Sequence, residues 1–135
     1  MKNEVSIGRA GEFLVASIVE TFGYRVVLCQ QQGFDMLLID GNDYYRCEVK
    51  ATKGLAKDRS KRYAFTTSTG SKVKKPIDPE LVDIVCLVAI DLRKCWFVKT
   101  SKSGKVSTKV PFDLMAYNDE AEQIKEIIRR FKEDG

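Results

Sequence analysis

The sequence predicts an α/β fold in which a mixed central β-sheet is flanked by an N-terminal and a C-terminal helix. Two observations carry this prediction: helical patterns lie near the two ends of the chain, and at least four strand-like segments lie between them. A length of 135 residues with 44% hydrophobic and 31% charged residues fits one globular domain spanning 1–135.

The first helix is expected over residues 6–22, with Ser6 as its N-cap and Gly23 as its left-handed C-cap residue. Its apolar residues cover most of the circumference, which predicts a mostly buried helix. Two strand-like runs follow, at 24–28 and at 34–39, because both are rich in β-branched or other apolar residues.

A third strand is expected over 44–51, directly after a tight turn. The pair Gly41-Asn42 between the two runs fits a two-residue hairpin loop. A short strand is expected at 63–67, and the small polar residues of 68–71 are typical of a loop tip.

The second half of the chain begins with a continuous apolar run at 84–90, which predicts a central strand covered on both faces. A turn leads to a further strand at 95–100, and a glycine-containing turn follows at 102–105. Apolar residues at helical spacing then predict an amphipathic helix over 118–131.

Residue counts exclude several classes of function. The chain has no histidine, which rules out Ser-His-Asp and Cys-His catalysis and histidine-ligated zinc. No apolar run approaches the ~20 residues of a membrane helix, and the polar N-terminus leads into no signal-like stretch, so we expect an intracellular, cytoplasmic protein without membrane contact. Without a CxxC pair, the four cysteines are expected to be free, mostly buried thiols: Cys29, Cys47, Cys86 and Cys95.

Basic charge is concentrated in the middle of the chain. Between residues 50 and 75 there are nine lysines and arginines and one acid, Asp58, although the net charge of the whole chain is only +4. Such a segment is an electrostatic footprint for a polyanion. Charge alone leaves nucleic acid, phospholipid and an acidic protein open as partners, and a solvated loop is the alternative.

The expected hairpin places acidic residues opposite one another. If Asp40 faces Asp43 across the turn, counting back along both strands places Asp35 opposite Glu48. Direct cross-strand neighbours lie ~5 Å apart at Cβ and share one face of the sheet. Lys50 lies two residues beyond Glu48 and therefore shares that face as well.

Two opposed carboxylates repel each other, and a divalent cation between them removes that cost. Oxygen ligands of this kind suit Mg²⁺ or Mn²⁺. The alternative is a surface ion-pair cluster in which Lys50 and Arg46 neutralise the acids. Glu12 favours the metal site, because it lies in the apolar first helix, where an unpaired charge is costly; alternatively, it reaches water at the edge of that face.

The series of a helix glutamate, a strand aspartate and Glu-x-Lys on the next strand resembles the PD-(D/E)XK nuclease superfamily. The matching residues are Glu12, Asp35 and Glu48-Val49-Lys50, with Phe34 in place of the usual proline. Residues 8–15 resemble the first helix of archaeal-type Holliday junction resolvases, and the step from Asp35 to Glu48 is similar to theirs. The series also resembles phage and cyanobacterial homing endonucleases built on this fold.

The resemblance implies a restriction-endonuclease-like core and a metal-dependent DNA endonuclease. Asp35, Glu48 and the backbone carbonyl of Val49 would bind Mg²⁺ or Mn²⁺. Lys50 would orient the attacking water or stabilise charge in the transition state. Glu12 would hold a further water or a second metal, and Tyr63 is a further candidate for acid–base work.

DNA is the implied partner. Gln31 and Gln32 are candidates for contacts to base edges, with a polar loop as the alternative. The basic side chains expected to contact the DNA backbone are Lys53, Lys57, Arg59, Lys61, Arg62, Lys72, Lys74 and Lys75. Because one chain holds one candidate site, cutting two strands implies a homodimer.

The leading hypothesis is a homing- or restriction-like endonuclease that acts on duplex DNA. A Holliday junction resolvase that cuts four-way DNA junctions is the first alternative. A non-catalytic nucleic-acid-binding domain is the second alternative. A structural or inhibitor protein whose basic segment binds an acidic partner is the third.

Overall fold

The structure of the protein, a computed structural model, describes residues 4–29, 33–66, 68–69, 75–102 and 107–134. No helix in these ranges has the length and apolar character needed to cross a membrane. The elements lie along the chain in the order α1 (Glu4–Thr21), β1 (Arg25–Leu28), β2 (Met36–Asp40), β3 (Asp43–Thr52), β4 (Arg62–Thr66), β5 (Ser68–Thr69), β6 (Lys75–Pro76), β7 (Ile84–Ala89), β8 (Lys94–Lys99), β9 (Ser107–Pro111), α2 (Phe112–Ala116) and α3 (Glu120–Asp134).

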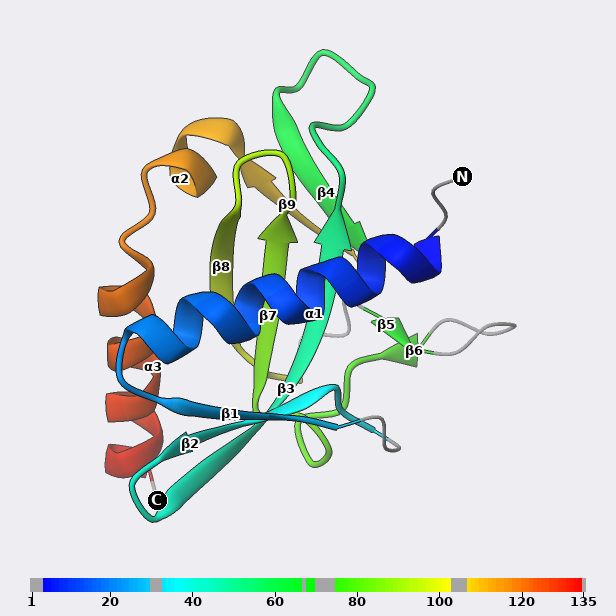
Figure 1. The fold of residues 1–135 in the computed structure, drawn as a ribbon. Coiled ribbons are helices and arrows are strands. Elements are labelled where there is room, and N and C mark those ends of the chain that lie inside the picture. Colours follow the sequence, from blue (N-terminus) through cyan, green and yellow to red (C-terminus); the bar gives the residue numbers. More distant parts are fainter. Residues whose placement is uncertain (1–3, 30–32, 67, 70–74, 103–106, 135) are drawn as a thin grey trace.

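A five-stranded sheet with the order β1-β2-β3-β7-β8 forms the centre of the fold (Figure 1). The β3–β7 pair is parallel and the other three pairs are antiparallel, so the sheet is mixed. Two small antiparallel sheets, β4–β9 and β5–β6, lie beside it. The predicted α/β class, with a mixed central sheet and a helix at each end of the chain, is confirmed.

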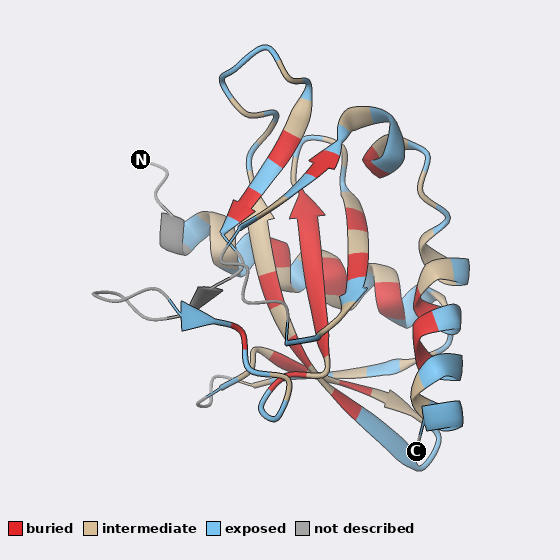
Figure 2. Ribbon diagram, turned by 180° about the vertical axis from the view of Figure 1, so that it is seen from behind, coloured by how far each residue is buried: buried red, intermediate tan, exposed pale blue. Residues whose placement is uncertain are grey.

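The central sheet is covered on both faces. Helices α1 and α3 pack against one face and share a core with its side chains, while β4, β9 and α2 cover the other (Figures 1 and 2). Strand β7 is buried along its whole length, as the continuous apolar run predicted. Alternate residues of β7 enter the two cores: Ile84, Cys86 and Val88 face the helices, and Val85, Leu87 and Ala89 face the small sheet.

Helix α1 lies unusually close to β3. A Cβ atom built on Gly11 would lie 2.7 Å from the Cβ of Ala51, so only glycine fits at this contact. Val15 and Val19 continue the buried face. The prediction of a mostly buried helix is wrong for the outer face, because Phe13 is 53% exposed there.

Other local predictions were incomplete. Ser68 and Thr69, expected at a loop tip, pair with Lys75 and Pro76 as strands β5 and β6. Strand β9 and helix α2 were not predicted, because both are short and carry few buried apolar residues. Most of the turn expected at 102–105 lies outside the described residues. Three cysteines are buried and free as expected, and Cys29 is partly exposed and free.

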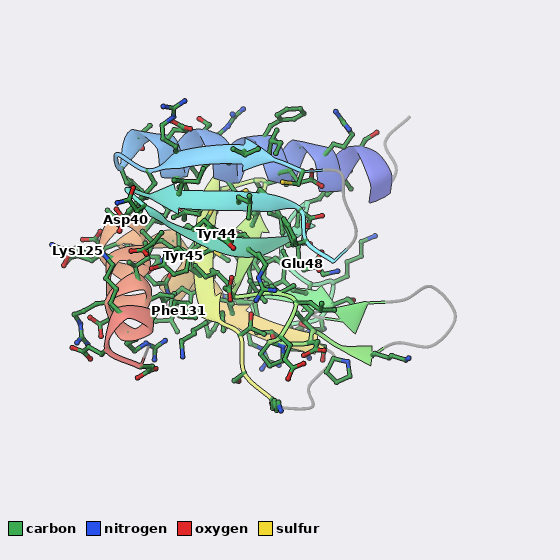
Figure 3. All side chains as sticks on the ribbon, turned by 90° about the horizontal axis from the view of Figure 1, so that it is seen from below. Asp40, Tyr44, Tyr45, Glu48, Lys125 and Phe131 are labelled. Carbon is green, nitrogen blue, oxygen red and sulfur yellow. The ribbon has the colours of Figure 1, made fainter. Side chains whose placement is uncertain are left out.

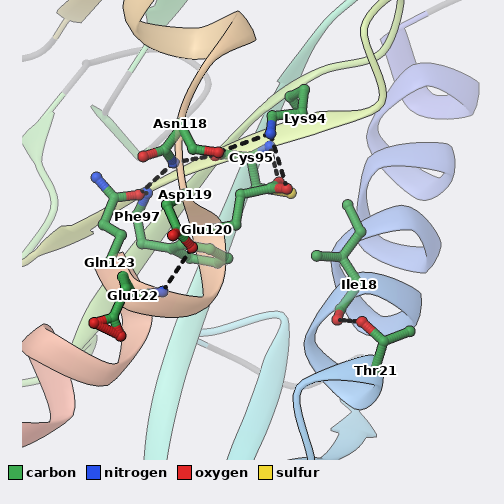
Figure 4. A network of polar contacts seen from close by, with 10 residues as sticks. All are labelled: Ile18, Thr21, Lys94, Cys95, Phe97, Asn118, Asp119, Glu120, Glu122 and Gln123. Carbon is green, nitrogen blue, oxygen red and sulfur yellow. Dashed lines mark hydrogen bonds and ion pairs between the residues drawn. The ribbon is translucent and has the colours of Figure 1, made fainter.

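Side chains of the C-terminal segment occupy the outer edge of β8 (Figure 4). The backbone N–H of Cys95 donates to Glu120 Oε2 at 2.6 Å, and the N–H of Phe97 donates to Gln123 Oε1 at 2.7 Å. The amide of Asn118 donates to the Cys95 carbonyl at 2.8 Å. These bonds satisfy backbone groups that an edge strand otherwise leaves open.

The opposite edge of the sheet has a similar contact. The backbone N–H of Val26 in β1 donates to Glu20 Oε2 of helix α1 at 2.7 Å. A helix carboxylate therefore binds a strand N–H at each edge of the sheet.

Candidate active site

The β2–β3 hairpin sets the position of the two predicted carboxylates. Asp40 pairs with Asp43 across the turn, and Gly41 has a φ of 62°, which a tight hairpin turn requires. At the other end of the ladder Met36 pairs with Cys47, so the next step places Asp35 beside Glu48. The register predicted from the sequence is confirmed.

Asp35 is fixed by two bonds to the neighbouring strand. Its backbone N–H donates to the Cys47 carbonyl at 2.8 Å. Its side-chain Oδ2 accepts the backbone N–H of Val49 at 2.7 Å. On an extended strand the N–H and C=O of one residue point to the same side, so the Val49 carbonyl lies on the side from which Asp35 approaches.

Glu48 has a strongly perturbed carboxyl group. Burial raises the pKa of Glu48 to about 8, with further contributions from the charge of Asp35 and from a hydrogen bond with it. The charge of Lys50 lowers the pKa of Glu48, and the charge of Glu12 raises it by a smaller amount. The group is thus poised between its protonated and ionised forms near neutral pH, a property common at functional sites.

Helix α1 brings Glu12 within electrostatic reach of the pair. Burial and then the charge of Asp35 raise the pKa of Glu12, while Arg9 lowers it. Glu12 directly follows Gly11, whose close contact with Ala51 holds this turn of the helix against β3. The three acidic residues predicted as one constellation are therefore coupled by charge.

Arg46 does not neutralise the acids of the site. Its guanidinium forms two hydrogen bonds with the Asp83 carboxylate, both at 3.1 Å, and Nη1 donates to the Glu80 carbonyl at 2.6 Å. In the alternative interpretation, a surface ion-pair cluster, Arg46 is therefore not one of the cations that neutralise the acids. This pairing was not predicted, because Asp83 lies 37 residues along the chain.

A groove of about 940 Å³ opens at the carboxylate pair. Asp35 and Glu48 line it together with most residues of the segment 75–82, and Lys102 lines it from the segment after β8. In Figure 3, Glu48 lies away from the packed rings of Tyr45 and Phe131, whose centroids are 5.1 Å apart. Lys102 was not predicted as a site residue, because only the pairing of β8 with β7 brings it to the groove.

The donor atoms at the site suit a hard divalent cation. Asp35 and Glu48 offer carboxylate oxygens, and Val49 offers a carbonyl. Burial is the largest cause of the raised pKa of Glu48, and the charge of Asp35 adds to it; a cation between the two carboxylates would remove this repulsion. Across the described ranges, no three histidine, cysteine, aspartate or glutamate side chains converge on one candidate metal position. The donor set thus consists of two side chains and one backbone group.

The predicted DNA-binding residues fall in three groups. Lys75 lines the groove. The members of the second group lie in or beside the loop after β3, which projects beyond the end of the sheet in Figure 1, and none lines the groove: Lys53, Lys57, Arg59, Lys61 and Arg62. The third group lies outside the described residues: Gln31, Gln32, Lys72 and Lys74.

Tyr63 is poorly suited to acid–base work. Its side chain is fully buried and its hydroxyl lies 3.1 Å from Asp91 Oδ2. Burial and this hydrogen bond raise the pKa of Tyr63 to about 12. Tyr63 is therefore part of the core between the sheet and β9.

The fold has a counterpart among solved structures. No protein-family model and no curated protein sequence matches the chain. A bacterial homing endonuclease, I-Ssp6803I, superposes with a TM-score of 0.66 at 10% sequence identity, covering 82% of this chain and 77% of the other. At this identity the likeness concerns the fold.

Proposed function

We propose that this chain is a metal-dependent DNA endonuclease that hydrolyses phosphodiester bonds in duplex DNA, in the manner of a homing or restriction enzyme. The observation that carries the proposal is the paired Asp35 and Glu48, set side by side by the hairpin and open to a groove. The likeness in fold to a bacterial homing endonuclease supports it.

Asp35, Glu48 and the Val49 carbonyl would hold Mg²⁺, or Mn²⁺ in its place. Such a cation supplies Lewis acidity: it polarises the phosphodiester and eases deprotonation of the attacking water. The protein contributes the fixed position of Asp35, which its bond to the Val49 N–H at 2.7 Å sets relative to Glu48.

Lys50 and Glu12 would act on the reacting groups. Lys50 follows Glu48 by two residues on the same strand, so its ammonium would orient the attacking water or stabilise negative charge on the phosphate. Glu12 would hold a further water, or a second cation, beside the pair. The PD-(D/E)XK resemblance rests on this set of Glu12, Asp35, Glu48 and Lys50.

DNA would bind through its backbone. The basic loop after β3 would contact phosphates away from the cut, which positions a duplex without selecting a sequence. The described residues of each chain contain one candidate site, so cutting both strands would use a homodimer with two sites.

A cleavage assay tests the proposal. Linear duplex and a four-way junction are incubated with Mg²⁺ or Mn²⁺, with Glu48→Gln as the site variant and Glu122→Gln as the matched control. Glu122 is exposed on α3, far from the pair in the sequence. Cleavage of linear duplex by the wild type and by Glu122→Gln, and not by Glu48→Gln, is the expected result.

Each other outcome selects a different function. Cleavage of the junction alone would make the chain a Holliday junction resolvase. DNA binding with no cleavage by any variant would identify a non-catalytic binding domain. Cleavage by Glu48→Gln at the wild-type rate would refute the assigned site.

A further inference from the structure

Part of the groove wall is a turn, residues 78–82, that is held by several hydrogen bonds. The backbone N–H groups of Leu81 and Val82 donate to the Asp78 carbonyl at 2.9 and 3.0 Å. The N–H of Glu80 donates to Asp78 Oδ1 at 2.9 Å. Asp78 thus closes the turn with its backbone and its side chain together.

Arg46 ties this turn to the strand that carries Glu48. Its Nη1 binds the Glu80 carbonyl, and its guanidinium and backbone N–H bind the Asp83 carboxylate. Arg46 precedes Glu48 by two residues on β3, so the same strand sets the positions of the catalytic carboxylate and of the groove wall. A wall held in this way keeps a fixed distance from the site.

The turn presents an apolar side chain to the groove. Leu81 is 54% exposed, and it lines the groove together with Pro76 and Pro79. A single exposed leucine is ordinary on a protein surface. Leu81 differs in that it shares a groove with a carboxylate pair, on a turn held by several hydrogen bonds.

Two lysines complete the groove. Lys75 reaches it from β6 and Lys102 from the segment after β8, and both are exposed. The groove therefore combines cations for phosphates, carboxylates for a metal ion, and an apolar contact for a sugar or a base. This combination of charge and apolar surface is complementary to one strand of nucleic acid.

We propose that this groove holds the strand to be cut in a locally unpaired form, with its phosphates against Lys75 and Lys102 and an unstacked nucleotide against Leu81. The proposal rests on the proposed function and specifies the form of its substrate. Apolar side chains of DNA-binding proteins insert at base steps and unstack them in this way. A substrate that is already unpaired avoids the cost of unstacking and should bind more tightly.

Binding to three DNA probes tests the inference. The probes are a paired duplex, the same duplex with a short unpaired bubble, and the corresponding single strand, measured by fluorescence anisotropy with Ca²⁺ in place of Mg²⁺. We expect the wild type to bind the bubble about tenfold more tightly than the duplex. Leu81→Ala should lose this preference, and Leu81→Met, which keeps an apolar side chain of similar volume, should retain it.

Matched controls separate the groove from the rest of the surface. Leu114→Ala removes a leucine of α2 that is 52% exposed and lies outside the groove. Lys125→Ala removes an exposed lysine of α3, which Figure 3 shows at the far end of the molecule from Glu48. The double variant Lys75→Ala/Lys102→Ala should lower the slope of log affinity against log salt by about 1.4 to 1.8, or about 0.7 to 0.9 per lysine, and Lys125→Ala should not.

Two results would overturn the inference. The first is a preference for the bubble over the duplex that is equal in Leu81→Ala and in its control Leu114→Ala. The second is a salt slope that is equal in Lys75→Ala/Lys102→Ala and in the control Lys125→Ala. Failure of the inference is distinguishable from failure of the proposed function. If Glu48→Gln stops cleavage but the groove variants bind like their controls, only the inference fails. If the groove variants behave as expected but Glu48→Gln cleaves normally, only the catalytic assignment fails.

Discussion

Asp35 accepts the backbone N–H of Val49 through Oδ2 at 2.7 Å, which extends the β2–β3 pairing beyond its last pair of strand residues, Met36 and Cys47. The side chain is therefore both a structural acceptor and a candidate metal ligand. An asparagine at this position retains an acceptor oxygen and loses the charge. The two roles can thus be separated by substitution.

Asp35→Asn and Glu48→Gln should each reduce cleavage by at least ~100-fold, because they remove the negative charge that would hold the cation. DNA affinity should stay similar or rise, because a negative charge near the phosphate is lost. Single-turnover cleavage and anisotropy measure the two effects separately. Full activity in either variant would contradict the site assignment.

The metal-free protein should lose stability as the pH rises from about 4.5 to about 8. The folded-state pKa of Glu48 is raised to about 8 from an ordinary value of 4.5, so in this range the folded protein keeps a proton that the unfolded chain releases. The upper limit of the slope is about 1.4 kcal/mol per pH unit, and partial exposure of the group reduces it. Thermal melting with a chelator measures the slope.

Two comparisons check the origin of this slope. Glu48→Gln has no carboxyl to titrate, so its melting temperature should depend less on pH between 5 and 8. Added Mg²⁺ should raise the wild-type melting temperature more at pH 8 than at pH 5, because it competes with the proton. The same pH dependence in Glu48→Gln and the wild type would assign the effect to other groups.

Gly11→Ala should destabilise the fold by about 1–3 kcal/mol, because the added Cβ would lie 2.7 Å from that of Ala51. Gly8→Ala is the matched control, since nothing lies within 4 Å of a Cβ built there. It should stabilise the helix by up to about 1 kcal/mol. Denaturant unfolding measures both, and recovery of stability in Gly11→Ala/Ala51→Gly would locate the clash.

Neutralising the loop after β3 should weaken DNA binding without affecting catalysis at saturation. The triple variant Lys57→Ala/Arg59→Ala/Lys61→Ala removes three exposed cations and should lower the salt slope by up to about 2.7, at about 0.9 per phosphate contact. Anisotropy at several salt concentrations measures the slope. If the slope is unchanged, the DNA-binding surface lies elsewhere.

The hairpin was predictable because its register depends only on local signals. Gly41-Asn42 fixes the turn, and counting from Asp40 and Asp43 then places Asp35 beside Glu48. The pattern of apolar residues likewise located the central strand β7. These features need no knowledge of distant contacts.

The groove was not predictable, because long-range contacts build it. Arg46 binds Asp83 across 37 residues, and Lys102 reaches the site only through the place of β8 beside β7. The exposure of Phe13 was not predictable for the same reason. Helical periodicity shows which residues are apolar, but it does not show how much of the helix a sheet will cover.

The side chains along the outer edge of β8 also restrict how two copies of this chain can associate. Asn118, Glu120 and Gln123 occupy backbone groups of Cys95 and Phe97 that a second copy would need in order to extend the sheet across a twofold axis. At the other edge, Glu20 occupies the N–H of Val26. A dimer that extended the sheet through either edge would have to break these hydrogen bonds, whereas a dimer formed through side-chain surfaces would keep them. The spacing between the two candidate sites of such a dimer would then depend on those surfaces.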